Sequence, residues 1–104
     1  MNIVTVQYRV RFEARDAFVK LLAEHWPTLR RLGLVTDRPV ECYEGTDGSG
    51  NQPLVVEIFE WVSADAAQSA HVHPEVSCIW EAMGPLMREG EERPQRFHVA
   101  ELAV

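Results

Sequence analysis

Two histidines separated by one residue, His71 and His73, are the most suggestive candidates for chemistry in this chain. They lie in AHVHP, just before a proline that must interrupt a helix, and a side chain at such a break can point into a pocket. Histidine titrates near neutral pH, so either residue could move a proton. In the structural alternative, His71 bonds to the backbone at a helix end and His73 caps the next helix at the surface.

A His-x-His pair can also bind zinc when further ligands converge on it. No cysteine or acidic residue stands at a recognisable ligand spacing from this pair, although Glu57, Glu75 and His25 could approach it in space. Cys42 and Cys78 lack the electropositive setting of reactive thiols, so we expect them to be packing residues. GTDGSG lacks the lysine and the strand–helix context of a phosphate-binding loop. We therefore predict no metal site and no bound cofactor.

His25 and Glu57 are two further polar residues that the pattern places in the interior. His25 falls on the apolar stripe of a predicted helix, where it could pair with His71 as an acid–base site or be a hydrogen-bonded core residue. Glu57 falls in a predicted central strand, where an unpartnered carboxylate is costly. An ion pair with Arg9 or Arg11 of the neighbouring strand is the simplest expectation, and a pocket carboxylate is the alternative.

Several aromatic side chains could stack on a flat ligand, although packing in the core or at an interface would explain them equally well. On these grounds His71 and His25 are the candidate catalytic residues. The candidate substrate-binding residues are His73, Trp61, Trp80, Tyr43, Glu57 and Phe59.

The first third of the chain predicts a strand followed by a helix. IVTVQYRVRF alternates apolar and polar residues, which indicates a strand over Asn2–Phe12. Apolar residues at helical spacing then predict a helix over Ala14–Leu32, kinked or restarted at Pro27. Gly33 is its natural stop.

The middle of the chain predicts two strands and a broken helical region. A short strand over Pro39–Glu44 leads through a hairpin loop in GTDGSGNQP to the strand Leu54–Val62, which is apolar on both faces and therefore central. Ser63 is the expected N-cap of a short helix over Ala64–His71. A second helix starts at Pro74, and its apolar stripe ends near Met87.

RFHVAELAV, residues 96–104, predicts a last strand. The order β-α-β-β-α-β indicates an α+β, ferredoxin-like fold in which two helices cover one face of a four-stranded antiparallel sheet. The first and third strands should be central. The uncovered face would still carry large side chains, aromatic ones of the third strand among them. An apolar face of that kind requires cover, so we predict a symmetric homodimer formed through the sheet face.

Composition limits the function classes. A length of 104 residues with 46% apolar and 25% charged residues indicates a single globular domain over residues 1–104. The net charge of −6 argues against nucleic acid and against an anionic membrane surface as partners. Without a leader, a membrane span or a disulfide framework, a cytoplasmic location is expected.

The stretch from Val55 to Leu86 resembles the dimeric α/β-barrel superfamily, and most closely its antibiotic-biosynthesis-monooxygenase-type domains. The shared pattern is an apolar strand carrying Glu57 and Trp61, a short helix ending in Ala70 and His71, then Pro74 and a helix with Trp80 and Leu86. The resemblance implies a homodimer whose sheets form an α/β barrel. It also implies a pocket between sheet and helices in each protomer.

Members of this superfamily include cofactor-free oxygenases of phenols and quinols and haem-degrading enzymes. The haem branch uses a histidine and a tryptophan at positions that hold Trp80 and Ala70 here, so no haem ligand is implied. The polar set of the cofactor-free branch includes an asparagine, and this chain has only Asn2 and Asn51. Two functions remain open: a cofactor-independent oxygenase of a small aromatic molecule, or a non-catalytic dimeric module that binds a small ligand or has a structural role.

Overall fold

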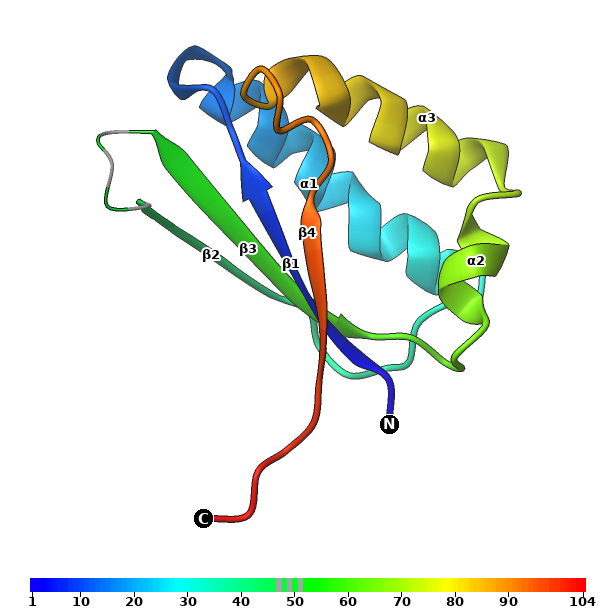
Figure 1. The fold of residues 1–104 in the computed structure, drawn as a ribbon. Helices are drawn as coiled ribbons and strands as arrows, with labels where there is room; N and C mark the ends of the chain where they lie inside the picture. The colour runs from blue at the N-terminus through cyan, green and yellow to red at the C-terminus, as the bar shows by residue number, and fades with distance from the viewer. Residues whose placement is uncertain (47, 49, 51) are drawn as a thin grey trace.

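The computed structural model describes residues 1–46, 48, 50 and 52–104 and places them in two layers, a sheet and a layer of helices (Figure 1). The strands are β1 (Ile3–Arg9), β2 (Glu41–Thr46), β3 (Pro53–Glu60) and β4 (Gln95–Val99). The helices are α1 (Arg15–Arg31), α2 (Ala66–Ala70) and α3 (Pro74–Met83), with single turns η1 (Phe12–Ala14) and η2 (Gly84–Leu86).

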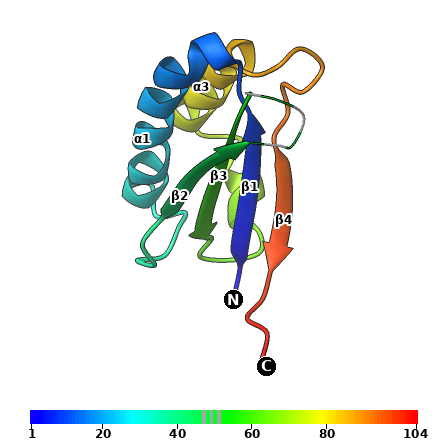
Figure 2. The same ribbon diagram turned by 90° about the vertical axis from the view of Figure 1, so that its left-hand side faces the viewer.

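The sheet has the order β2-β3-β1-β4, and each neighbouring pair is antiparallel. The predicted α+β, ferredoxin-like fold is confirmed, with β1 and β3 at the centre. Figure 2 shows the strands side by side, with α1 and α3 on one side of the sheet. The short α2 joins β3 to α3.

The register decides which side chains face the helices. Val6 pairs with Glu57, and Val4 pairs with Phe59, so even positions of β1 and odd positions of β3 share one face. These residues are buried, and Phe18 and Leu29 of α1 pack with them in the core. The helix-covered face therefore holds a carboxylate among apolar side chains.

The expectation that aromatic residues of the third strand lie on the uncovered face is wrong. Phe59 belongs to the helix-covered face, and Trp61, two residues further on, is buried in the same core. The aromatic residues of the uncovered face come from the edge strands instead: Tyr43 is 57% exposed and Phe97 is 48% exposed. Tyr43 pairs with Val56 and Phe97 with Thr5, positions whose side chains point away from the helices.

The first helix differs from its prediction at Pro27. Helix α1 runs without interruption from Arg15 to Arg31. Pro27 lies on the exposed side, where the carbonyl that loses its N–H partner can be hydrated. Gly33 does end the helix: its φ of 75° lets its N–H reach the Arg30 carbonyl, while the Leu34 N–H bonds to Leu29.

Other element boundaries differ by a few residues. Strand β1 ends at Arg9, although Val10 N–H still bonds to the Pro53 carbonyl of β3 and Val10 forms an isolated bridge with Met87. Helix α2 has Asp65 rather than Ser63 at its N-cap, without a side-chain bond. Strand β4 ends at Val99, which pairs with Ile3, the first residue of its partner strand β1, and the tail beyond extends away from the sheet (Figure 1).

The expected hairpin between β2 and β3 is present in the register, in which Thr46 pairs with Pro53. Residues 47, 49 and 51 of its loop lie outside the described residues. In the described part of the chain, no helix is long and apolar enough to cross a membrane.

Candidate functional site

A cavity of about 450 Å³ lies between the helix-covered face of the sheet and α3. Its wall combines aromatic, thioether and charged side chains. The lining residues are Tyr8, His71, Trp80, Met83, Met87, Glu92, Arg93, Pro94 and Arg96. The wall therefore combines apolar surface with several polar and charged groups that could orient a small molecule.

A buried chain of hydrogen bonds ends at two residues of this cavity. Tyr8 Oη donates to Glu57 Oε1 at 2.8 Å, and His25 Nδ1 lies 2.9 Å from Oε2 and 3.1 Å from Oε1. At the other end, Trp80 Nε1 donates to His25 Nε2 at 3.0 Å. Glu57 is 0% exposed and His25 is 3% exposed, so the centre of the chain is shielded from water.

The direction of each hydrogen bond follows from the donor inventory. An indole Nε1–H can only donate, so His25 Nε2 accepts and the imidazole proton is on Nδ1. That proton is donated to Glu57, which also accepts from Tyr8. Hydrogen bonds donated to a carboxylate favour its charged form, so this arrangement favours a neutral His25, a neutral Tyr8 and a negative charge on Glu57.

The hydroxyl of Tyr8 reflects this charge. Burial, and then the negative charge and hydrogen bond of Glu57, raise the pKa of Tyr8 well above 10.0, while the nearby Arg96 opposes the shift. Tyr8 therefore stays protonated and keeps donating to Glu57.

Four elements supply the side chains of this hydrogen-bond series. Glu57 and Tyr8 lie on the same face of β3 and β1, His25 projects from the buried side of α1, and Trp80 comes from α3. The strand period of two and the helix period of 3.6 turn these residues toward the same layer. Any shift of one strand by one residue would turn Glu57 to the opposite face.

Trp80 belongs both to the buried series of hydrogen bonds and to the lining of the cavity. The ring of His71 meets its indole edge to face, with centroids 4.8 Å apart and an interplanar angle of 64°. The guanidinium carbon of Arg96 lies 5.6 Å from the indole centroid, which is a cation–π distance. The aromatic wall thus has a histidine and a cation beside it.

The candidate catalytic residues occupy different places. His71 is exposed and lines the cavity, whereas both ring nitrogens of His25 are engaged inside the protein. Both rings contact Trp80, and no contact between the two histidines is found among the described residues.

The candidate substrate-binding residues are also divided. Trp80 lines the cavity, while Glu57 lies behind it. Phe59 packs edge to face against His25 in the core, and in turn contacts Trp61. His73 is the N-cap residue of α3, as the structural alternative has it, and its side chain makes no cap bond.

Tyr43 is remote from the cavity lining, on the uncovered face of the sheet.

Glu57 does not pair with Arg9 or Arg11, so that expectation is wrong. The register places Val6 opposite Glu57, and the odd-numbered Arg9 therefore points to the opposite face of the sheet. Arg9 lies 3.8 Å from Glu91, and Arg11 donates to the Met87 carbonyl. If the strand period of two had been applied to both strands, Arg9 and Arg11 would have been excluded as partners of Glu57.

Both cysteines are exposed residues, although Cys42 also lines an apolar groove against α1. Cys42 pairs with Glu57 across the sheet, and its thiol is turned toward the helices. Burial there, and then the charge of Glu57, raise the pKa of the Cys42 thiol to about 11, which makes it a poor nucleophile.

Several cavity residues were missed, above all Tyr8 and Arg96. Tyr8 stands among valines on a face that the alternation predicts to be buried, and a buried tyrosine hydroxyl needs a partner. That signal was available. The proximity of Arg96 to Trp80 depends on the pairing of β4 with β1, for which the sequence of β4 carries no local signal.

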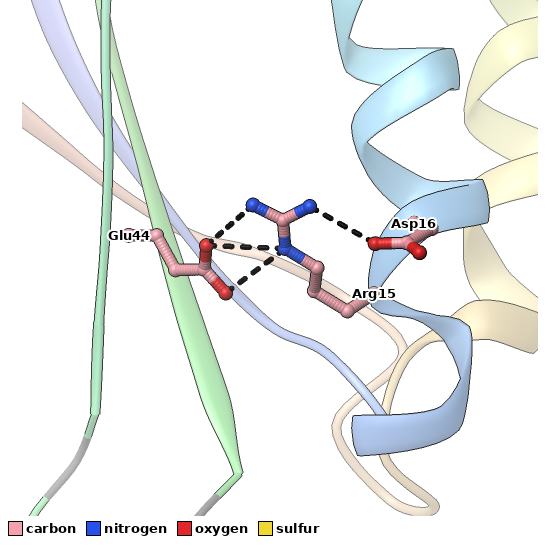
Figure 3. A network of polar contacts seen from close by, with 3 residues as sticks. All are labelled: Arg15, Asp16 and Glu44. Carbon is pink, nitrogen blue, oxygen red and sulfur yellow. Dashed lines mark hydrogen bonds and ion pairs between the residues drawn. The ribbon is translucent and has the colours of Figure 1, made fainter.

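Two other hollows offer fewer polar groups that could act on a ligand. One, of about 560 Å³, surrounds Arg15, which bonds to Glu44 at 2.7 Å and to Asp16 at 3.0 Å, so its main charges already pair with one another (Figure 3). The other, of about 250 Å³, is an apolar groove between α1 and β2 that includes Trp26 and Cys42. Trp26 Nε1 is buried there without a hydrogen-bond partner among the described residues.

The sequence matches no protein-family model, and no curated protein is similar to it. Solved structures share its fold over nearly the whole length. An antibiotic biosynthesis monooxygenase superposes with a TM-score of 0.73 at 16% identity, covering 99% of this chain and 100% of that chain. A cofactor-independent oxygenase from Streptomyces nogalater gives a TM-score of 0.64 at 15% identity, with coverage of 99% and 95%.

A dimeric ferredoxin-like protein of unknown function from Jannaschia sp. gives a TM-score of 0.66 at 13% identity, with coverage of 97% and 100%. The chain therefore has the ferredoxin-like fold of the antibiotic-biosynthesis-monooxygenase domains, as its resemblance implies. At these identities the likeness establishes the fold, and the activity has to be argued from the site.

Proposed function

We propose that this chain, which has the antibiotic-biosynthesis-monooxygenase fold, is a cofactor-independent monooxygenase that binds a small phenol or quinol in the cavity beside Trp80. The observation that carries the proposal is the composition of the cavity wall. An indole, a histidine and an arginine are among the side chains that line a cavity of about 450 Å³, a usual size for a small-molecule site. One solved structure with this fold is a cofactor-independent oxygenase.

The residues have separate roles in this proposal. Trp80 stacks on the ring of the substrate, and His71 takes the hydroxyl proton as general base. Arg96 stabilises the resulting phenolate by its positive charge. His25 and Glu57 act from behind the wall, since neither is exposed to the cavity.

The oxygen chemistry needs only the substrate anion and dioxygen. An electron-rich ring carbon of the phenolate adds dioxygen and supplies both electrons of the new C–O bond, which gives a peroxide. After protonation, the peroxide O–O bond breaks, and the carbon loses its hydrogen as a proton. The products are a quinone carbonyl and one water molecule, so one dioxygen is used for each phenol oxidised.

The proposal includes a homodimer formed through the uncovered face of the sheet. Tyr43 and Phe97 expose aromatic surface there, and Ile58 and Val99 add aliphatic surface. Such a face is typical of an interface between subunits. A solved structure with the same fold is described as dimeric. The free cysteines support a reducing, cytoplasmic location.

A non-catalytic module that binds a small aromatic ligand is the second candidate. The observation that favours it is the state of His25: both of its ring nitrogens are engaged inside the protein, which leaves the exposed His71 as the base at the cavity. An exposed base is less shielded from water than most catalytic histidines.

Oxygen uptake separates the two candidates. Purified protein treated with a chelator is mixed with 1-naphthol, and dissolved oxygen is followed with an electrode. We expect uptake of one dioxygen per quinone formed and a loss of about a hundredfold or more in His71→Ala, the size of a missing general base. His73→Ala is the matched control, because His73 lies outside the cavity lining.

Binding of 1-naphthol without oxygen uptake would support the non-catalytic module. Absence of binding would contradict both candidates.

A further inference from the structure

We propose that Glu57 and His25 are positioning residues, which hold the Trp80 indole and the Tyr8 hydroxyl in the cavity wall through a hydrogen-bond chain of fixed direction. The proposal rests on the proposed function only in taking the cavity as the place where a ligand binds. It assigns a task to a fully buried carboxylate that an apolar core would not otherwise retain.

The position of Trp80 depends on the tautomer of His25. The indole N–H needs an acceptor, and Nε2 accepts only while the imidazole proton is on Nδ1. The opposite tautomer, or a protonated ring, would direct an N–H of His25 at the N–H of Trp80.

The tautomer in turn depends on the charge of Glu57. His25 Nδ1 lies 2.9 Å from Oε2 and 3.1 Å from Oε1 of Glu57. Because both oxygens can accept a hydrogen bond, they keep the imidazole proton on Nδ1. No lysine or arginine bonds to Glu57 among the described residues, so the two neutral donors, His25 and Tyr8, satisfy it. The carboxylate of Glu57 thus fixes the tautomer of His25, and this tautomer fixes the orientation of the Trp80 indole.

The same charge sets what Tyr8 offers to a ligand. Its single hydroxyl proton is committed to Glu57 at 2.8 Å, so only oxygen lone pairs remain. Tyr8 therefore acts as a hydrogen-bond acceptor in the cavity wall, and the N–H of Trp80 is likewise withdrawn from the ligand. The wall accordingly favours a ligand that brings its own donor, such as an aromatic hydroxyl.

Glu57→Gln is the most direct test because it keeps the volume and removes the charge. The amide NH₂ at the Oε2 position would donate to Nδ1, which moves the imidazole proton to Nε2 and opposes it to the indole N–H. Nitrogen NMR of the His25 ring reports the tautomer. The part of the tryptophan fluorescence that is lost in Trp80→Phe reports the Trp80 indole, since Trp26 and Trp61 also emit. Glu60→Gln, on the same strand but bonded to Thr36 Oγ1, is the matched control.

We expect Nδ1 to carry the proton in the unmodified protein and in Glu60→Gln, and Nε2 to carry it in Glu57→Gln. Affinity for 2-naphthol, measured by calorimetry, should fall about tenfold in Glu57→Gln, because the indole beside the ligand loses the hydrogen bond to His25 that holds it in place. In a Trp80→Phe background, Glu57→Gln should change this affinity less than about twofold, since the donor that it disturbs is absent.

The proposal is overturned if nitrogen NMR finds the imidazole proton of His25 on Nε2 in the unmodified protein. This measurement does not depend on the folding of a variant. It is also overturned if Glu57→Gln lowers the affinity equally in both backgrounds. Failure of the unmodified protein to bind 2-naphthol would count against the proposed function instead, and the tautomer and fluorescence would still decide the present proposal.

Discussion

At the scale of single residues, the centre of the molecule is the buried carboxyl group of Glu57, to which no lysine or arginine bonds among the described residues. Tyr8 and His25 supply its hydrogen bonds, and burial of all three makes each of them costly to remove. The effect on Tyr8 can be measured directly, because its pKa is raised well above 10.0 by burial and by Glu57.

The raised pKa of Tyr8 predicts a loss of stability in alkali. Between the pKa of a tyrosine in the unfolded chain, near 10, and the higher pKa in the fold, the native state holds a proton that the unfolded state has lost. This contribution to stability is fully present below about pH 10 and is lost as the pH rises through the folded pKa. Urea unfolding should therefore show falling stability above about pH 10.

Absorbance at 295 nm in Tyr43→Phe, where Tyr8 is the remaining tyrosine, gives the same pKa independently. The titration should occur well above pH 10 and coincide with unfolding. A reversible titration near pH 10 in the folded protein would contradict the buried hydrogen bond to Glu57.

The sequence was a good guide to burial at this scale and a poor one to partners. The helical spacing predicted an inward His25, and the structure buries it. The partner of Glu57 was predicted wrongly because Arg9 and Arg11 offered positive charges on the predicted neighbouring strand. The strand period of two turns Arg9 to the opposite face of the sheet. A hydroxyl among valines, Tyr8, was the better candidate.

At the scale of elements, the start of α1 is tied to the edge strand β2 by an ion pair. Arg15 donates to both carboxylate oxygens of Glu44, and this hydrogen bonding lowers the pKa of Glu44 below its usual 4.5 (Figure 3). Strand β2 is exposed along its whole length, so it has few other contacts of this kind.

Glu44→Gln should destabilise the protein slightly at neutral pH, because both side chains of this pair are partly exposed to solvent. A carboxyl with a lowered pKa stabilises the fold above its usual value of about 4.5, and the effect is lost as the pH falls through the folded pKa. Thermal unfolding at pH 7 and pH 3, in low and high salt, measures the difference.

The expected difference between Glu44→Gln and the unmodified protein is largest at pH 7 in low salt and disappears at pH 3 or in high salt. Glu24→Gln, an exposed carboxylate of α1 with no ion pair in the described part of the chain, should show no such pattern. An effect of Glu44→Gln that persists at pH 3 would mean that packing, rather than charge, is responsible.

Elements were more predictable than their ends. The central strands and the two long helices have periodic patterns, and Gly33 and Pro74 mark an end and a start as expected. The ends of β1 and β4 could not be predicted, because a strand stops where its partner does, and pairing is not a local property. Pro27 is tolerated in α1 because it faces solvent.

At the scale of the whole molecule, one protomer leaves one face of its sheet uncovered. The homodimer that we propose predicts a mass of twice 11.8 kDa by light scattering at micromolar concentration. Phe97→Asp should shift the protein toward the monomer, because an unpaired charge would be buried at the interface. Phe12→Asp is the control, since Phe12 is an exposed phenylalanine outside the sheet. A monomeric unmodified protein would refute the interface.

The central claim is that the cavity beside Trp80 binds a small phenol, and NMR mapping with 2-naphthol tests it most directly. The account predicts saturable chemical-shift changes at His71, Trp80 and Arg96, which line the cavity. Changes that concentrate instead at Trp26 and Cys42, in the groove between α1 and β2, would contradict it.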